Sequence, residues 1–317
     1  MKVYLATVAD ETWSRELRAE MTAVAIRDRF GEHELAASAA SADIVLFVDA
    51  QQHLPDWRMR GLRTHPLVRE REHDAFVYDQ RDLPRGLLPG VFVALPASRF
   101  DRRRQRACGY YRLTTDTRGV RDEAPDLLFS FQGREFQGAR QAVLALDHPR
   151  ALIEDTSRHD FFAGDDPVLE GAQQRYRDVI GRSKFVLCPR GAGTSSFRLF
   201  ETLAAGRVPV ILSDDWVEPD GVDWPSCSVR VREADAAAVP DLLTRLEPGW
   251  SEMGAAAAAV YDEWFAPDVW FHHVVESCAE IRESGRTGLA PQWRTRAYWR
   301  DAARHWRAVR RARAGRG

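Results

Sequence analysis

The sequence is poor in lysine, and this scarcity limits what its charge says about function. Of its 45 basic residues only Lys2 and Lys184 are lysines, which leaves 43 arginines. This preference for arginine over lysine holds along the whole chain, so the number of arginines is not evidence for an anion-binding site. The 47 acidic residues give a net charge of −2, which provides no overall attraction for nucleic acid or for an anionic membrane. Nucleic acid is therefore not an expected partner.

Cysteines and long hydrophobic runs are also scarce. The four cysteines, Cys108, Cys188, Cys227 and Cys278, lie far apart with no C-x-x-C pair, a pattern that indicates neither a zinc site nor a disulfide framework. No stretch approaches the roughly 18 apolar residues that a membrane-spanning helix needs, and the first residues lack the apolar centre of a signal peptide. We therefore expect no metal site and a cytoplasmic protein.

The alternation of apolar runs with helical patterns predicts an open α/β fold. A chain of 317 residues is long enough for two domains, since a domain averages about 150 residues. Residues 42–48 are too uniformly hydrophobic for a sheet with one wet face, so they predict a parallel strand covered on both faces. Further strands are predicted at 3–8, 75–78 and 91–95, and a helix at 13–30.

The polar stretch 114–126 is the predicted linker between the two domains. It contains Gly119 and Pro125, residues that interrupt regular structure. The α/β pattern restarts after it, with strands predicted at 127–131, 151–153, 185–188 and 208–212. We therefore predict domains at 1–122 and 123–285, followed by a C-terminal segment at 286–317.

The last residues predict a basic amphipathic helix. Between residues 292 and 317 arginines are frequent, and Trp299, Trp306 and Val309 recur at helical spacing. One interpretation is a helix that binds weakly to the surface of an anionic membrane. The other, which we favour, is a terminal helix that packs against the protein's own core.

The most informative segment is residues 183–216, SKFVLCPRGAGTSSFRLFETLAAGRVPVILSDDW. It predicts a strand, a glycine loop, a helix capped by Ser195 or Ser196 that runs to Ala205, Gly206 at the C′ position, and a second strand. This order forms a right-handed βαβ unit whose loop lies at the carboxyl edge of a parallel sheet. A helix N-terminus at that edge attracts phosphate through its N–H groups and positive dipole.

Side chains in and after this loop suit a nucleoside diphosphate. The candidates are Arg190, Gly191, Ser195, Ser196, Arg198 and Glu201. Arginines and hydroxyls can donate to phosphate oxygens, a glycine lets the backbone approach a ligand, and a carboxylate can accept from both hydroxyls of a ribose. The alternative is that Arg198 and Glu201 form a surface ion pair at i,i+3 while Arg190 is solvated. The spacing matches neither Walker A nor G-x-G-x-x-G.

The same segment resembles the signature of the exostosin family of glycosyltransferases. The resemblance rests on Cys188–Gly191, Arg198–Glu201, Val208–Ile211 and Ser213–Asp215. Less distinctively, residues 128–131 with Gly133 and Arg140 resemble the strand and loop that open the donor-binding domain of that family. The likeness covers roughly residues 127 to 220.

The resemblance implies a GT-B architecture, in which two Rossmann-like domains face a cleft. The C-terminal domain would bind a nucleotide sugar, the N-terminal domain would bind the acceptor, and the final helix would pack back on the first domain. By position, Arg190 and Arg198 would stabilise the diphosphate, Ser195 and Ser196 would hold phosphate or sugar, and Glu201 would bind the ribose. Gly133 and Arg140 would belong to the same donor site. Asp214 and Asp215 follow a strand, so they either reach the donor sugar or cap a turn.

An inverting transfer needs a base that takes the proton of the acceptor hydroxyl. Asp79, Asp49 and Asp10 each follow a predicted strand of the first domain, and Asp79 is the first choice. His53 lies close to Asp49 in sequence. The alternative for each aspartate is a capping or turn role, and a retaining transfer would not use this base.

The expected function is transfer of a sugar from a nucleotide diphosphate sugar, with UDP preferred, to a glycan, a lipid-linked glycan or a small molecule. Because fixed cations and helix N–H groups can stabilise the leaving diphosphate, we expect no metal and no cofactor besides the donor. One alternative is a fucosyltransferase-like enzyme that uses a GDP-sugar. Another is a protein that binds nucleotide sugars without catalysis. The family context suggests polysaccharide biosynthesis.

Overall fold

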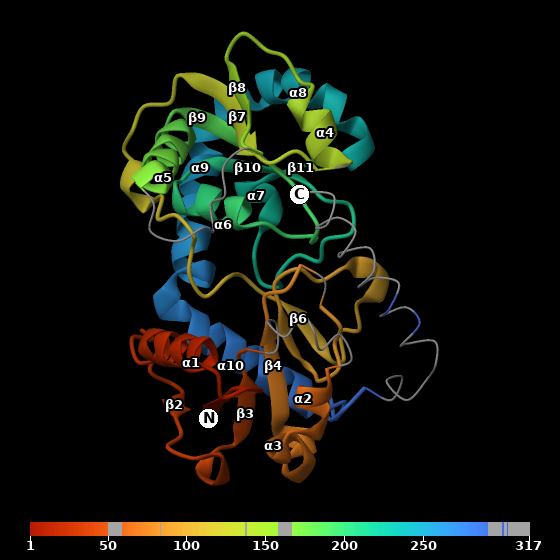
Figure 1. The fold of residues 1–317 in the computed structure, drawn as a ribbon. Helices are drawn as coiled ribbons and strands as arrows, with labels where there is room; N and C mark the ends of the chain where they lie inside the picture. The colour runs from red at the N-terminus through yellow and green to blue at the C-terminus, as the bar shows by residue number, and fades with distance from the viewer. Residues whose placement is uncertain are drawn as a thin grey trace. The chain divides into compact units, whose positions relative to one another are not determined.

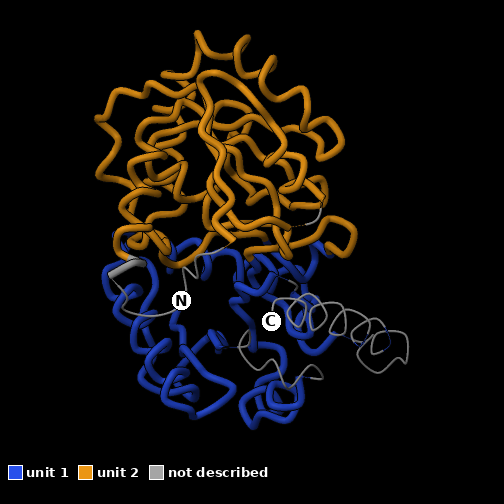
Figure 2. The backbone as a smooth tube through the Cα atoms, turned by 45° about the horizontal axis from the view of Figure 1, so that its top comes forward, with its two compact units in different colours: residues 1–92, 101–106, 270–317 blue, residues 93–100, 107–269 orange. Residues whose placement is uncertain are grey.

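The protein folds into two compact units, each built from segments distant in sequence. The computed structural model describes residues 1–49, 59–82, 84–136, 138–157 and 167–290, together with Arg300 and Ala303. Unit 1 comprises Met1–Phe92, Asp101–Arg106 and Trp270–Gly317, and unit 2 comprises Val93–Phe100 and Ala107–Val269 (Figure 2). Most of the predicted C-terminal helix lies outside the described residues, so neither interpretation of segment 292–317 is tested.

Unit 1 contains a twisted sheet in the strand order β2-β1-β3-β4-β5-β6 (Figure 1). Its strands are β1 (Lys2–Ala6), β2 (Glu34–Leu35), β3 (Ile44–Phe47), β4 (Ala75–Asp79), β5 (Gly90–Phe92) and β6 (Gln105–Ala107). Strand β1 pairs in parallel with β2 and β3, and the parallel pairing continues to β4 and β5. Every residue of β3 is buried, which confirms the prediction that this strand is covered on both faces.

The helices of unit 1 are α1 (Thr12–Ala25), α2 (Arg60–Thr64), α3 (Pro66–Glu70) and most of α10 (Pro267–Glu283). Helix α10 begins in unit 2, and from Trp270 onward it belongs to unit 1. There Trp270 packs edge-on against Tyr78 of β4, with ring centroids 5.0 Å apart. This contact assigns residues 270–285 to the first unit, whereas the sequence pattern assigned them to the second domain.

Unit 2 contains a five-stranded parallel sheet in the order β11-β10-β9-β7-β8. Its strands are β7 (Leu127–Gly133), β8 (Ala151–Asp155), β9 (Ser183–Pro189), β10 (Val208–Leu212) and β11 (Val229–Arg230). Numbered within each unit, the first five strands of both sheets follow the order 2-1-3-4-5 of a doubly wound fold. The predicted fold class, two Rossmann-like α/β halves, is confirmed at this level.

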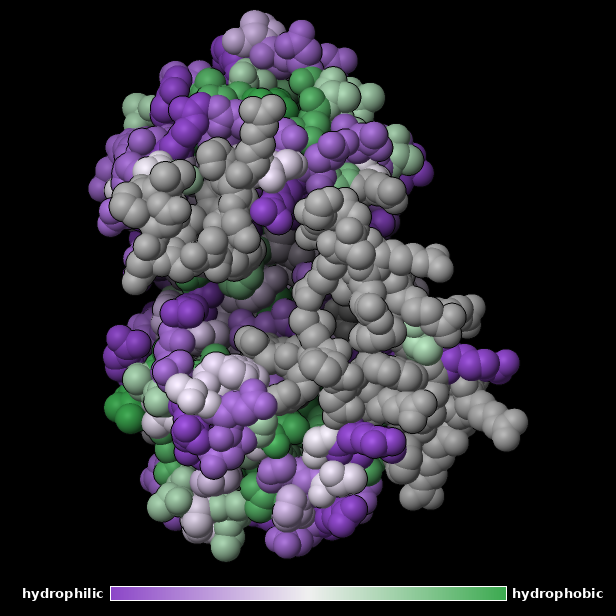
Figure 3. Space-filling view, viewed as in Figure 1, coloured by the Kyte–Doolittle hydropathy of each residue, from purple (hydrophilic) through white to green (hydrophobic). Residues whose placement is uncertain are grey.

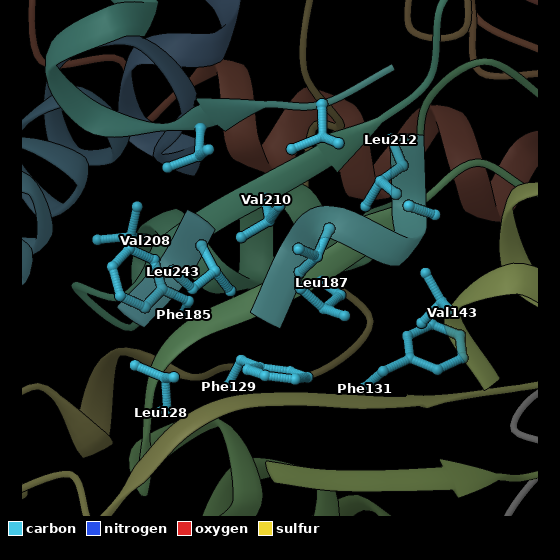
Figure 4. Close-up of a cluster of buried hydrophobic side chains, with 14 of the residues drawn as sticks. Leu128, Phe129, Phe131, Val143, Phe185, Leu187, Val208, Val210, Leu212 and Leu243 are labelled. Atoms are coloured by element: carbon cyan, nitrogen blue, oxygen red, sulfur yellow. The ribbon is translucent and has the colours of Figure 1, made fainter. Parts of the chain in front are cut away.

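Helices cover both faces of the unit 2 sheet. They are α4 (Ala139–Leu144), α5 (Pro167–Gly181), α6 (Phe197–Ala204), α7 (Trp224–Cys227), α8 (Val239–Leu246) and α9 (Trp250–Val260). Side chains of α4 and α8 pack on one face with Phe129, Phe131 and Phe185 in a buried hydrophobic cluster (Figure 4). A second cluster lies on the α5 side and joins Ile180 to Val186 of β9.

Residues 93–100 also belong to unit 2, although the sequence predicted a first-domain strand as far as Leu95. Strand β5 ends at Phe92, and the following backbone bonds to the segment after β10. The N–H of Val217 donates to the Leu95 carbonyl at 3.0 Å, and the N–H of Ala97 donates to the Asp215 carbonyl at 2.7 Å. These long-range backbone hydrogen bonds move the boundary between the units.

The polar stretch 114–126 is not a linker. Thr115 and Thr117 are buried, and Val120 joins the apolar cluster beneath α5. The hydroxyl of Thr117 donates to the backbone carbonyl of Glu201 at 2.5 Å. Polar groups of this stretch bond to the interior of unit 2. Its composition therefore matches that of a solvated linker, although the stretch is part of the folded unit.

Arg207 ties this stretch to the rest of unit 2. Its side chain is 2% exposed, and it donates to the carbonyls of Gly181 at 2.7 Å, Glu123 at 2.8 Å and Val120 at 3.0 Å. Burial lowers the pKa of this arginine below its usual value. The guanidinium therefore joins backbone carbonyls of the stretch 120–123 to the carbonyl of Gly181 at the end of α5.

Glycines allow α9 to pack directly on the end of α6. A Cβ atom placed on Gly254 of α9 would lie 2.6 Å from the carbonyl oxygen of Gly206, just after α6. That distance is too short for any side chain. The two backbones therefore meet without an intervening side chain.

The described surface that Figure 3 draws carries both hydrophilic and hydrophobic residues. On the face drawn in Figure 3 the described surface is mostly hydrophilic, with apolar residues in small separate patches. Among the described residues, no helix is long and apolar enough to cross a membrane.

Replacing Arg207 should destabilise the protein strongly. We expect Arg207→Met to lower the free energy of unfolding by about 3–5 kcal/mol, because it removes the hydrogen bonds that this buried guanidinium donates to three backbone carbonyls. Urea denaturation measures the change. Arg182→Met is the matched control, since Arg182 is a half-exposed arginine paired with Asp126, and we expect a much smaller effect from it. Similar unfolding curves for the two variants would contradict the role assigned to Arg207.

Candidate functional site

The βαβ unit predicted from residues 183–216 is present in unit 2. Strand β9 ends at Pro189, α6 begins at Phe197, and β10 follows in parallel register. Gly206 has a left-handed backbone with φ of +64°. Its N–H donates to the Leu203 carbonyl at 2.9 Å, and the N–H of Arg207 donates to the Thr202 carbonyl at 3.1 Å. This is a Schellman motif, so the prediction that Gly206 ends the helix is confirmed.

The loop before α6 lies at the position where doubly wound sheets bind ligands. Strands β7 and β9 are neighbours in the sheet, and the chain leaves β7 for one edge and β9 for the other. The crevice outside the carboxyl ends of two such strands is the usual ligand site of open α/β folds. Here these ends are Gln132–Gly133 on β7 and the loop that starts at Arg190 after β9.

Arg198 extends from the first turn of α6 to the end of β7. Its Nη2 donates to the backbone carbonyl of Gln132, and its guanidinium lies 4.6 Å from the ring centroid of Phe131. A Cβ on Gly133 would lie 2.7 Å from this Nη2, so a side chain at position 133 would displace the end of the arginine. The Nε and Nη1 of Arg198 are buried and find no hydrogen-bond partner in the described part of the chain.

Glu201 lies inside unit 2 rather than at the edge of the loop. The carboxyl is 3% exposed, and it accepts from the Tyr176 hydroxyl at 2.7 Å and from the Thr115 N–H at 3.0 Å. Burial raises the pKa of Glu201, and the two hydrogen bonds oppose that rise. Burial likewise raises the pKa of Tyr176 well above its usual value. The alternative of a solvated surface ion pair between Arg198 and Glu201 is therefore wrong, and ribose binding by Glu201 stays a prediction.

Arg190 is held by an acidic residue from a distant segment. Its Nε lies 2.6 Å from Oε1 of Glu233, and 36% of its side chain stays exposed, so Arg190 is both paired and partly solvated. Glu233 and Asp214 exchange hydrogen bonds, since the carboxylate of each accepts from the backbone N–H of the other, at 3.0 and 3.2 Å. Asp215 accepts from the N–H and hydroxyl of Ser98 in the distant segment 93–100.

The hydroxyl groups of the loop are close to the start of α6. Ser195 is 6% exposed, and within the described residues its Oγ and the Oγ1 of Thr194 are buried without a hydrogen-bond partner. The sequence predicted Ser195 or Ser196 as the N-cap of α6, and the structure places Ser196 there. Its side chain makes no capping bond to the described residues. The first-turn N–H groups of α6 are therefore not satisfied by this serine.

Gly191 and Arg140 form a second contact between a glycine and an arginine. Arg140 comes from α4, and its Nη1 donates to the carbonyl of Arg134 at 3.3 Å. A Cβ on Gly191 would lie 2.9 Å from the Nη2 of Arg140. The structure thus brings Gly191 and Arg140 together, and separately Gly133 and Arg198, at the carboxyl edge of one sheet.

Sequence reasoning missed four residues that shape this region, namely Gln132, Tyr176, Thr115 and Glu233. Tyr176 and Thr115 bind Glu201, and Glu233 binds Arg190. Their spacing from the motif in sequence is large, so no local pattern marks them. Gln132 stands directly before Gly133 in the strand that resembles the donor-binding domain, and a polar residue at a buried strand end was a signal that could have identified it.

The three aspartates proposed as bases have different environments in unit 1. Asp49 is buried and accepts from the N–H groups of Val8 and Ala9 and from the hydroxyl of Ser14. Asp79 is buried, and both of its oxygens accept from Arg81. Asp10 is exposed and pairs with Arg15. His53 lies outside the described residues.

Metal ligands do not gather anywhere in the described ranges. No group of three or more His, Cys, Asp or Glu residues there is arranged so that it could hold a metal ion. The cysteines at 108, 188, 227 and 278 are free thiols.

Comparison with known proteins identifies related sequences over part of the chain. The Exostosin-1 homolog of Caenorhabditis elegans is 39% identical over 92 residues, which is 28% of this chain and 24% of the relative. Probable glucuronosyltransferase GUT1 of rice is 30% identical over 123 residues, 36% of this chain and 30% of the relative. Probable glucuronoxylan glucuronosyltransferase IRX7 of Arabidopsis thaliana is 43% identical over 70 residues, 22% of this chain and 16% of the relative. The matches span less than a third of the length of these relatives.

Solved structures give weaker likenesses. A glycosyltransferase from Rickettsia africae matches with a TM-score of 0.45 and 10% identity, over 88% of this chain and 98% of that chain. Anabaena Alr3699/HepE in complex with UDP matches with a TM-score of 0.39 and 10% identity, over 88% of this chain and 100% of that chain. At these scores the likeness adds nothing to the fold described above.

The comparison with protein families is decisive. The model of the Exostosin GT47 domain matches residues 34–246, which is more than half of the 317-residue chain. The match includes β7, β9, α6 and β10, the elements that place Gln132, Arg190 and Arg198. The protein therefore belongs to the Exostosin GT47 family.

Proposed function

We propose that this protein is a glycosyltransferase that transfers a sugar from a nucleoside diphosphate sugar, with UDP as the nucleotide. The acceptor is a hydroxyl of a glycan, a lipid-linked glycan or a small molecule. One observation carries the proposal. At the carboxyl edge of β7 and β9, Arg198 Nε and Nη1 and the hydroxyls of Thr194 and Ser195 are buried without hydrogen-bond partners among the described residues. Buried polar groups in folded proteins are normally satisfied, so such a set indicates a ligand.

The chemistry of this set fits a diphosphate. Arg198 offers the N–H groups of two nitrogens, Nε and Nη1, and a fixed positive charge, and the two hydroxyls can donate to phosphate oxygens. The N-terminus of α6 adds N–H groups and the positive end of the helix dipole. When the bond between the sugar and the diphosphate breaks, negative charge grows on the diphosphate, and donors already in place stabilise it. The same groups thus bind the donor and favour the transition state.

The names of the relatives support glycosyl transfer but not one sugar. They include exostosins, glucuronosyltransferases and a probable beta-1,4-xylosyltransferase. UDP as the nucleotide comes from the resemblance to exostosins. A GDP-sugar and binding without catalysis are the alternatives that the experiments below distinguish.

Among the aspartates of unit 1, the geometry now favours Asp10 as the base of an inverting transfer. Asp10 is exposed and follows β1, which is the neighbour of β3 in the sheet. The carboxyl ends of two such neighbouring strands form the ligand-binding crevice of an open α/β sheet, as at β7 and β9 in unit 2, so Asp10 lies at the crevice of this sheet. Asp49 holds the loop that contains Val8 and Ala9, and so we assign it a positioning role. For Asp79 to accept a proton, Arg81 would have to release both of its oxygens, whereas the bond that Arg15 donates to Asp10 goes to Oδ1.

Nucleotides should stabilise the wild-type protein through Arg198. In a thermal-shift panel of UDP, GDP, dTDP and ADP we expect UDP to raise the melting temperature, since a ligand at 100 times its Kd adds about 2.7 kcal/mol of stability. The shift should persist in EDTA, because side chains and helix N–H groups bind the diphosphate. Arg198→Met should abolish the shift, and Arg182→Met should leave it unchanged.

The panel also separates the alternatives. A shift with GDP alone would support the GDP-sugar enzyme. A UDP shift without any release of UDP from UDP-sugars, whatever acceptor is added, would support a binding protein. If no nucleotide stabilises the wild type, the donor site at β7 and β9 does not exist as proposed.

Substitution of Asp10 should affect catalysis without affecting donor binding. We expect Asp10→Asn to lower kcat by about 100-fold or more, because a general base contributes roughly 10²–10⁴ to a rate. UDP release from the UDP-sugar, with water as acceptor, gives kcat, and calorimetry gives donor affinity. Asp49→Asn should instead lower the melting temperature, since it weakens three hydrogen bonds that this buried side chain accepts. An Asp10→Asn variant with wild-type kcat would rule out this base.

A further inference from the structure

The side chain of Gln132 has one end fixed and the other unsatisfied. Gln132 is the next-to-last residue of β7 and is 7% exposed. Its Nε2 donates to Oε2 of Glu154, on the neighbouring strand β8, at 2.6 Å. Its Oε1 is buried and has no hydrogen-bond partner within the described ranges.

The orientation of this amide follows from the charge of its partner. Glu154 forms an ion pair with Arg175 of α5, whose Nε donates to Oε2 of Glu154 at 3.2 Å and whose Nη2 donates to Oε1. A carboxylate in such a pair is ionised and can only accept hydrogen bonds. The amide nitrogen of Gln132 must therefore face Glu154, and the oxygen must face away from it.

The unsatisfied Oε1 of Gln132 accepts hydrogen bonds, whereas the unsatisfied groups of Arg198 close to it donate them. The backbone carbonyl of the same glutamine accepts from Arg198, whose Nε and Nη1 are unpaired donors among the described residues. A diphosphate carries oxygens that accept hydrogen bonds, so it suits Arg198 and would be repelled by Gln132 Oε1. The part of a ligand that meets Gln132 must instead carry a donor, which in a nucleotide sugar is a hydroxyl or a ring N–H.

We propose that Gln132 is a specificity-determining residue that accepts a hydrogen bond from a hydroxyl or N–H group of the nucleotide sugar. Glu154 and Arg175 are its positioning residues, because they hold the amide with its oxygen toward the ligand. This inference rests on the proposed donor site and adds to it a buried amide oxygen, which can only accept and so distinguishes a nucleotide sugar from a bare diphosphate. A site with a buried acceptor rejects ligands that lack the matching donor, since the acceptor would stay unpaired.

The test compares affinities for UDP and UDP-glucose by isothermal titration calorimetry. We expect Gln132→Leu to weaken binding of UDP-glucose by about tenfold or more, the usual scale for leaving one buried hydrogen-bonding group unpaired. Equal weakening of UDP places the donor group on the nucleoside, and weakening of UDP-glucose alone places it on the sugar. Should GDP be the nucleotide that stabilises the wild type, GDP and GDP-fucose replace these two ligands.

Two further variants keep the test independent of folding defects. Gln174→Leu is the matched control, because Gln174 is an exposed glutamine on α5 that bonds to Asp178, and we expect wild-type affinity. The double variant Glu154→Arg with Arg175→Glu keeps an ion pair but presents a donor to Gln132. The amide should then turn its nitrogen toward the ligand, so binding should weaken although Gln132 is unchanged. Melting temperatures identify any variant that fails to fold.

The outcomes separate failure of this inference from failure of the donor site. Wild-type affinity of folded Gln132→Leu for both ligands overturns the inference and leaves the donor site in place. Weak binding by Gln132→Leu with wild-type binding by the double variant overturns the positioning role of Glu154 and Arg175. If the wild type itself binds no nucleotide, the proposed function fails, and the inference fails with it.

Discussion

The buried carboxylate of Glu201 is the interaction on which the arrangement of the site depends. It accepts from Thr115 in the segment before β7 and from Tyr176 on α5, so three separate parts of unit 2 meet at one side chain of α6. A buried carboxylate is costly unless it is hydrogen-bonded, and here the donors compensate for that cost. Since Arg198 precedes Glu201 by one turn of the helix, fixing Glu201 also fixes where the Arg198 side chain starts.

Around this fixed helix the site combines satisfied and unsatisfied groups. Glu233 holds Arg190 and Asp214, and Glu154 holds Gln132. In contrast, the free N–H groups of Arg198 and the hydroxyls of Thr194 and Ser195 are buried without partners in the part of the chain described. The protein thus uses acidic side chains from distant segments to hold some polar groups in place, while others close to the sheet edge are left for the ligand that we propose. Such preorganisation is what transition-state stabilisation requires.

Much of the local structure could be predicted from the sequence, because local patterns determine it. The strand, loop and helix of residues 183–216, with Gly206 at the helix end, follow from hydrophobic spacing and glycine conformation. The site partners could not be predicted this way, since Tyr176, Thr115 and Glu233 are brought to Glu201 and Arg190 by tertiary packing. Residues 114–126 were interpreted as a linker because buried and solvated polar segments have the same composition. The role of Arg207 could not be predicted for a related reason. In a chain this rich in arginine, the sequence does not show which arginine is buried and structural.

The contact between Gly254 and Gly206 has a mechanical consequence for α6. Where helices meet through side chains, rotamer changes let them slide or separate slightly. Here the backbone of α9 rests on the backbone at the end of α6, so no rotamer exists that could absorb a displacement. The interaxial spacing at this point is set by covalent geometry and van der Waals radii alone. We therefore expect the C-terminal end of α6 to be a stiff support, so that thermal fluctuation within this helix concentrates at its N-terminal turn.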